Sequence, residues 1–88
     1  MPKATIGRTV IILNVPSNGA IEQPAVITRA WSDLPTEQGA VAVNLTVFPD
    51  CAAPVCKSSV LLFDNAEAAH LHLGQNPHAI VAHWPERA

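Results

Sequence analysis

Hydrophobic and polar residues alternate along much of this chain with the two-residue period of β-strands. Residues 41–48 alternate most regularly, and a strand with this pattern buries one face and exposes the other. The same period, together with many β-branched residues, predicts strands over residues 7–15, 24–31, 41–48, 58–63 and 79–84. The buried face is expected to include Val41, Val43, Leu45, Val47, Val60 and Leu62.

Turn-forming residues separate these predicted strands. Pro16, Asn18 and Gly19 follow the first strand, and residues 32–39 and 51–57 are predicted to be loops. Short strands with turn signals roughly every 8–12 residues predict an antiparallel barrel or a small two-sheet sandwich. A small antiparallel barrel of about five strands, of the SH3-like kind, fits the chain length best, so the predicted fold class is all-β.

Residues 65–74 allow two interpretations. Asn65 is a suitable N-cap, good helix formers follow it, and Gly74 stands where a glycine commonly ends a helix. These signals predict one short helix of about two turns. Histidine and leucine also alternate over residues 70–73, however, so an extended insertion is the alternative.

The 88 residues are 49% hydrophobic and 14% charged, which is typical of a single folded domain that spans residues 1–88. A chain of this size buries only roughly 60–65% of its unfolded surface, so modest stability and a homo-oligomer are expected. The net charge is −2 and the basic residues never cluster, which argues against general nucleic-acid binding. No apolar run approaches the roughly 20 residues of a membrane span, and no secretory signal is expected behind Met1.

The two cysteines, Cys51 and Cys56, are expected to be free thiols in a loop. Without an export signal, a structural disulfide is disfavoured. Zinc is the alternative, because the chain also has four histidines, but no C-x2-C pair is present and the histidine spacing does not match a zinc knuckle. We therefore expect no metal site.

The polar residues form no recognisable catalytic motif. None of the serines lies in a G-x-S-x-G turn, the acidic residues are scattered singly, and the glycines do not form a phosphate-binding loop. We therefore expect a protein that is not an enzyme and has no catalytic residue and no cofactor.

Large side chains with polar edges gather near the ends of two predicted strands, and they are candidates for ligand binding. Within residues 24–31, the two-residue period places Arg29 and Trp31 on one face, together with Ala25 and Ile27. Indole rings stack on planar groups, and arginine and histidine bind anionic oxygens. The alternative is structural: the tryptophans fill the ends of the barrel and the arginines are solvated. The candidate ligand-binding residues are Arg29, Trp31, His83, Trp84 and Arg87.

Three sequence blocks carry a resemblance to a known group of proteins. They are residues 24–31 (PAVITRAW), residues 43–50 (VNLTVFPD), and Ser59-Val60 followed at a distance by residues 83–87 (HWPER). In these blocks the chain resembles short, mostly hypothetical proteins of tailed bacteriophages and prophages. Ala82 departs from that group, in which tryptophan is frequent at this position, and residues 65–74 resemble an insertion. The resemblance implies a phage origin and expression in the cytoplasm of a bacterial host, and it implies no particular activity.

Two kinds of function are expected from these observations. In the first, the protein is a phage accessory that binds without catalysis and sequesters a small anionic, nucleotide-like ligand of host defence signalling at a subunit interface. In the second, it is a small structural protein of the virion that decorates a capsid or tail. An inhibitor that binds a host defence protein directly is a third possibility. Functional residues exposed at an interface would favour the first kind, and a flat apolar edge strand would favour the second.

Overall fold

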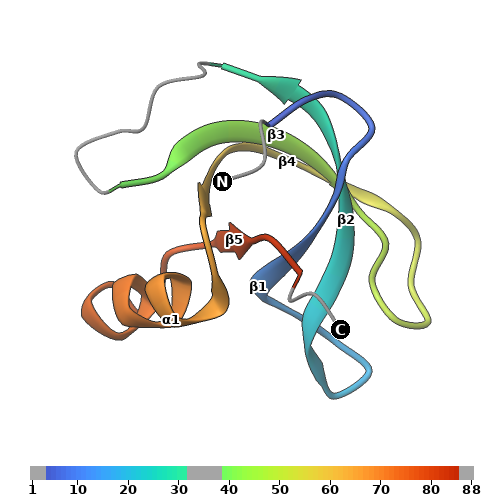
Figure 1. Cartoon of the computed structure of the whole chain (residues 1–88). Helices are drawn as coiled ribbons and strands as arrows, with labels where there is room; N and C mark the ends of the chain where they lie inside the picture. Colours follow the sequence, from blue (N-terminus) through green and yellow to red (C-terminus); the bar gives the residue numbers. More distant parts are fainter. Residues whose placement is uncertain (1–3, 32–38, 86–88) are drawn as a thin grey trace.

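The computed structural model describes residues 4–31 and 39–85, which form a closed barrel with one helix beside it (Figure 1). Around the barrel the strands follow one another in chain order, β1-β2-β3-β4-β5, and β5 returns to pair with β1. This arrangement confirms the prediction of a small all-β, SH3-like barrel with one short helix. The elements are β1 (Thr9–Ser17), β2 (Ala20–Ala30), β3 (Val41–Val47), β4 (Val55–Phe63), α1 (Ala66–Gln75) and β5 (Val81–His83).

One strand pairing differs from the fully antiparallel barrel that the sequence predicted. The last strand, β5, pairs antiparallel with β1 but parallel with β4, with Leu61 opposite Val81. Consecutive parallel strands need a crossover connection, and α1 supplies it here. The helix packs against β4 and β5 on the outside of the barrel. The segment of residues 65–74, which resembled an insertion in the sequence, therefore forms the connection that makes β5 parallel to β4.

The core fills the barrel as the alternation of residues 41–48 predicted. Every second residue of β3 points inward and is buried, and Val60 and Leu62 of β4 meet them inside the barrel. A second, smaller cluster lies between the barrel and α1, where Phe63 and Val81 pack against Ala69. The second cluster holds the helix against β4 and β5.

Capping bonds define both ends of α1 and confirm the helical interpretation of this segment. The side chain of Asn65 accepts a hydrogen bond from the N–H of Ala68 at 2.9 Å, as an N-cap does. At the other end, the N–H of Asn76 donates to the carbonyl of His72. The helix therefore continues through Gly74 and does not end there, as the sequence had suggested. Within residues 4–31 and 39–85, no helix is long and apolar enough to cross a membrane.

All five strands differ in at least one boundary from the sequence prediction. The β1–β2 hairpin is longer than expected, because Asn18 and Gly19 form its turn with φ angles of 51° and 83°, the left-handed geometry that suits tight hairpins. The expected loop at residues 51–57 is shorter, since β4 begins at Val55 and includes Cys56. At the C-terminal end, β5 covers only Val81–His83 of the predicted residues 79–84.

Candidate ligand-binding site

The strand β2 carries a β-bulge next to the middle of β3. Ile27 pairs with Leu45, but the next pair is Arg29 with Asn44, so Thr28 is an extra residue in β2. A bulge of this kind reverses which face the following side chains occupy. Ile27 is therefore buried in the barrel, whereas Arg29 is exposed on its outer face.

A second bulge lies on the other side of the same residue. In β4, both Ser58 and Ser59 lie opposite Asn44. Ser59 has a φ of 54°, a left-handed conformation that costs a non-glycine residue on the order of 1 kcal/mol. Its backbone N–H donates to Oδ1 of Asn44 at 3.0 Å, and this bond holds the strained residue in place. Asn44 is thus bordered by a bulge in each neighbouring strand.

Trp31 is fixed on the outer face of the barrel by the same asparagine. Its indole Nε1–H donates to Oδ1 of Asn44 at 2.8 Å, and its backbone N–H donates to the carbonyl of Ala42 at 2.9 Å. The guanidinium carbon of Arg29 lies 3.9 Å from the centre of the indole ring. Trp31 is nevertheless 48% exposed. The result is an indole held in one orientation with much of its surface in contact with solvent.

The sequence correctly predicted that Arg29 and Trp31 share a face, but it placed them with the wrong neighbours. Ala25 and Ile27, assigned to the same face, are completely buried inside the barrel. The bulge at Thr28 shifts the alternation by one residue, and it moves the arginine and the tryptophan to the outside.

An open hollow of about 330 Å³ is lined in part by Asn44, the residue that accepts the hydrogen bond of the Trp31 indole. Thr28 and Ser58, which both carry hydroxyl groups, line this hollow. The Thr28 hydroxyl donates to the backbone carbonyl of Asn44 at 3.2 Å. Among the described residues of the hollow and of the Trp31 contacts, the ionised side chains are Arg29 and Lys57, both positive. We define the Trp31 face as Thr28, Arg29, Trp31, Asn44, Lys57, Ser58 and Ser59.

Trp84 has a different environment, which matches the structural alternative for this residue. It is only 6% exposed and packs in the main core cluster, where it helps to fill the barrel. Its indole Nε1 is buried and has no hydrogen-bond partner in the described part of the chain. The guanidinium carbon of Arg8 lies 5.3 Å from its ring centre. The two tryptophans therefore do not form one surface.

His83 is buried next to Trp84 and is also outside the Trp31 face. It is 4% exposed, and its Nδ1 donates to the backbone carbonyl of Trp84 at 2.8 Å. Its Nε2 lies 3.8 Å from a carboxylate oxygen of Glu22, and its ring centre lies 6.5 Å from that of His70. The fifth predicted ligand-binding residue, Arg87, lies outside the described residues.

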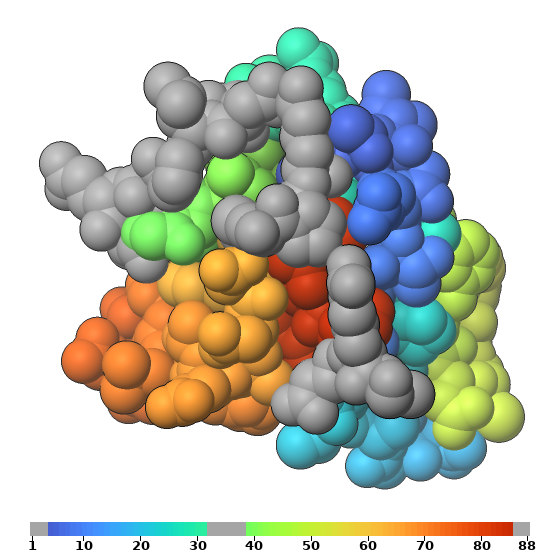
Figure 2. All heavy atoms as spheres, in the orientation of Figure 1, coloured from blue at the N-terminus to red at the C-terminus, as the bar shows by residue number. Residues whose placement is uncertain are grey.

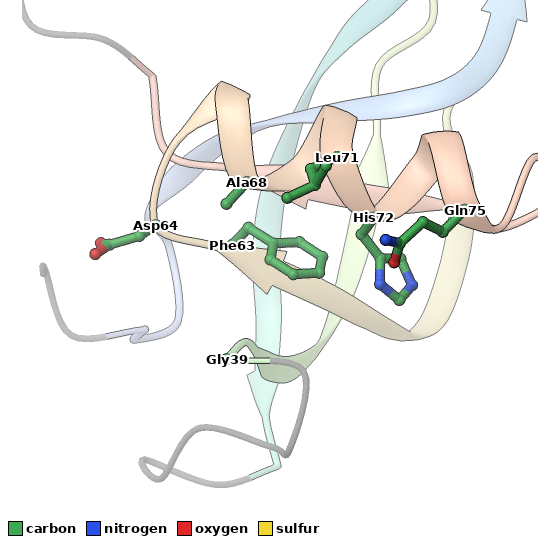
Figure 3. Close-up of a pocket in the computed structure, with 7 residues that line it drawn as sticks. All are labelled: Gly39, Phe63, Asp64, Ala68, Leu71, His72 and Gln75. Carbon is green, nitrogen blue, oxygen red and sulfur yellow. The ribbon is translucent and has the colours of Figure 1, made fainter.

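A larger hollow, of about 410 Å³, lies between α1 and the end of β4 (Figure 3). Below the helix, the rings of Phe63 and His72 are tilted against each other with centres 5.2 Å apart. Its one carboxylate belongs to Asp64, at the start of the helix, and the described lining contains no lysine or arginine. This hollow is less suited to an anion than the Trp31 face, although it is larger.

The two cysteines do not change the choice of the Trp31 face as the candidate ligand-binding site. Cys51 and Cys56 are free and exposed, and Cys56 lies in β4 at the edge of the Trp31 face. In residues 4–31 and 39–85, no group of three or more histidine, cysteine, aspartate or glutamate side chains is arranged to hold a metal ion.

The structure adds functional candidates that sequence reasoning missed, above all Asn44. One signal for it was present in the sequence, because asparagine is depleted in strands and Asn44 stands in the most regular one. Ser59 and Lys57 gave no such signal. Comparison of the chain with protein-family models, with curated proteins and with solved structures finds no match.

Proposed function

We propose that this protein is a non-enzymatic, phage-encoded accessory that binds a small, planar, anionic ligand such as a nucleotide on the Trp31 face. One observation carries the proposal: a half-exposed indole is held rigidly by Asn44 while Arg29 lies against its ring. The sequence-based candidates Arg29 and Trp31 remain in this site, and Trp84 supports the fold.

The geometry of Trp31 supports a ligand that stacks. The indole N–H already donates to Asn44, so the group that it offers to a ligand is its π surface. Stacking of a base on an aromatic side chain is worth about 1–3 kcal/mol and depends little on base identity. Because the ring is already held in one orientation, little side-chain entropy is lost when a ligand binds.

The charge of the face supports an anion. Arg29 on β2 and Lys57 on β4 lie on either side of β3, with the hydroxyl-bearing residues Thr28 and Ser58 near them. Guanidinium and ammonium groups bind phosphate or carboxylate oxygens, and hydroxyl groups complete their hydrogen bonding. A nucleotide joins a planar base to such oxygens, and it therefore matches both parts of the site.

We propose that the protein binds its ligand without catalysing a reaction, because the described hydrogen bonds of the Trp31 face hold its own side chains in place. The Thr28 hydroxyl donates to a backbone carbonyl, and Asn44 accepts from the indole and from Ser59. An activated nucleophile would instead need a base within hydrogen-bond reach. The resemblance to phage proteins supports a role in the host cytoplasm, where the captured ligand would be withdrawn from host defence signalling.

Calorimetric titration of the full chain with cyclic dinucleotides, cyclic mononucleotides and adenosine and guanosine nucleotides tests the proposal. We expect at least one of them to bind and Trp31→Ala to weaken its affinity about 5- to 150-fold, the equivalent of about 1–3 kcal/mol. Trp31→Phe, which keeps a ring, should retain part of the affinity.

A matched control is available in the second arginine–tryptophan pair. Arg29→Ala should weaken binding, and the difference should shrink at high salt, where charge interactions are screened. Arg8→Ala, which removes the arginine beside the buried Trp84, should leave binding unchanged. If the wild-type protein binds no nucleotide in this panel, or if the Trp31 variants bind as well as the wild type, the proposed function is wrong.

A further inference from the structure

A second exposed aromatic side chain lies on the outside of the barrel at the end of β3. Phe48 follows the last residue of β3 and is 46% exposed, close to the exposure of Trp31. Its backbone N–H donates to the carbonyl of Pro24 at 2.9 Å, so the β2–β3 ladder continues through Phe48 and fixes its backbone. In Figure 2 the yellow-green segment that joins β3 to β4 protrudes at the right edge of the molecule, where a ligand can approach it.

Phe48 lies on the same face of the sheet as Asn44, the residue that holds the Trp31 indole. Every second side chain of β3 is buried inside the barrel, up to and including the last residue of the strand, so the side chains of Asn44, Thr46 and Phe48 point outward. The extra residues at the two bulges belong to β2 and β4, and they leave the alternation within β3 unbroken. The outer face of β3 therefore connects the two exposed aromatic rings.

A single base cannot stack on both rings, because they are far apart along β3. The stretch of strand from Asn44 to Phe48 spans about 13 Å. The backbone N–H of Trp31 donates to the carbonyl of Ala42, so the indole reaches Asn44 from the side away from Phe48. A ligand that contacts both rings must therefore carry two planar groups.

The hollow of about 330 Å³ extends from Asn44 toward Phe48. Its lining includes Cys56, which pairs with Thr46, the next outward residue of β3 after Asn44. Lys57, the neighbour of Cys56 in β4, lines the same hollow and carries a positive charge. An ammonium group placed between two aromatic rings suits a phosphate that links two bases.

We propose, on the basis of the proposed function, that the ligand of this site contains two bases joined through phosphate, as linear and cyclic dinucleotides do. One base stacks on Trp31 and the other on Phe48, and the linking phosphate lies in the hollow near Lys57. A mononucleotide has one base and occupies only the Trp31 end. When both bases belong to one molecule, the second stack forms without a second loss of translational freedom.

Calorimetric titration of the full chain with mononucleotides, linear dinucleotides and cyclic dinucleotides of adenosine and of guanosine tests this proposal. We expect a dinucleotide to bind about 5- to 150-fold more tightly than the mononucleotide of the same base, the effect of one further stack. Phe48→Ala should remove this advantage and leave the affinity for the mononucleotide at its wild-type value. Comparison of the linear with the cyclic form identifies which linkage fits the hollow.

Two further substitutions at Phe48 distinguish stacking from simple apolar contact. Phe48→Tyr, which keeps a ring, should retain most of the affinity for the dinucleotide, whereas Phe48→Leu, which is apolar without a ring, should lose it. Ile21→Ala is the matched control, because Ile21 is 64% exposed in β2 but lines a different hollow, together with residues of α1. This variant should bind both kinds of nucleotide as the wild type does.

The failure of this proposal is distinguishable from the failure of the proposed function. If Trp31→Ala weakens nucleotide binding but Phe48→Ala leaves the affinity for dinucleotides unchanged, the ligand does not use two bases and the proposed function stands. Dinucleotides that bind no more tightly than mononucleotides would also overturn the two-base ligand alone. If no nucleotide binds to the wild type, both proposals are wrong.

Discussion

The two tryptophans should respond very differently to truncation, although the sequence gives no reason to treat them differently. Trp84 is 6% exposed and lies in the main core cluster, whereas Trp31 is 48% exposed on the outer face. Trp84→Ala would leave a cavity inside a closed barrel, and such changes cost about 3–5 kcal/mol. Trp31→Ala would leave an opening to solvent and remove one hydrogen bond, worth about 0.5–1.5 kcal/mol, so we expect a loss below about 2 kcal/mol.

These free energies correspond to a readily measured difference in melting temperature. In a domain of this size, 1 kcal/mol shifts the melting temperature by about 4–8 °C. Trp84→Ala should therefore melt roughly 12–40 °C below the wild type and consume much of a total stability that is typically about 5–15 kcal/mol. Thermal unfolding followed by circular dichroism measures both variants, and urea unfolding gives the free energies directly.

The order of the two variants is the sensitive part of this prediction. If Trp31→Ala proved less stable than Trp84→Ala, or if Trp84→Ala stayed within about 1 kcal/mol of the wild type, the assignment of Trp84 to the barrel interior would be wrong. Arg8→Ala serves as the control, because it removes a neighbour of Trp84 without opening the core.

Three further changes test other parts of the fold. Val43→Asp should unfold the protein, because it places an unpaired carboxylate inside the barrel, and a cooperative melting transition in this variant would contradict the assigned core. Replacing both Cys51 and Cys56 with serine should change stability by less than about 1 kcal/mol in chemical unfolding, since both thiols are free and exposed; a larger loss would indicate a bridge or a metal. Gln23→Leu should cost about 1–3 kcal/mol, because the buried Gln23 side chain accepts the N–H of Asp50 at 3.0 Å; hydrogen exchange at that amide should rise in parallel, and an unchanged exchange rate would count against the bond.

The sequence predicted the parts of the fold in which alternation is uninterrupted. In β3, four inward residues follow one another at every second position, so their burial follows from the strand period alone. Asn65 likewise marked the start of α1, because asparagine is a favoured N-cap residue and good helix formers follow it. Both features depend on neighbours that are close in the chain.

The candidate site was less predictable because it depends on two bulges. The extra residue Thr28 reverses the alternation of β2, and a period counted across it gives Arg29 the wrong face. Ser59 adopts its left-handed conformation because Asn44, on the neighbouring strand, accepts its N–H. Such bonds join residues from different strands, and a pattern read along one strand does not contain them.

The burial of Trp84 was also undecided at the sequence level. A tryptophan near the end of a strand can fill the barrel or form part of a binding surface. The local sequence pattern is the same for these two roles. Only the closure of β5 between β1 and β4 places Trp84 against the core. The position of α1, which fixes the parallel direction of β5, therefore determines which of the two roles this residue has.

The shortness and late position of β5 have a consequence for the synthesis of this protein. Only three residues, Val81–His83, close the gap between β1 and β4. At a synthesis rate of about 5–20 residues per second, roughly 1–4 seconds pass between the completion of β4 and the emergence of β5. During this interval the meander of four strands has two unpaired edges, which can pair with other nascent chains. Rapid docking of β5 between β1 and β4 would therefore protect this chain from aggregation, and a chaperone that covers those two edges would have the same effect.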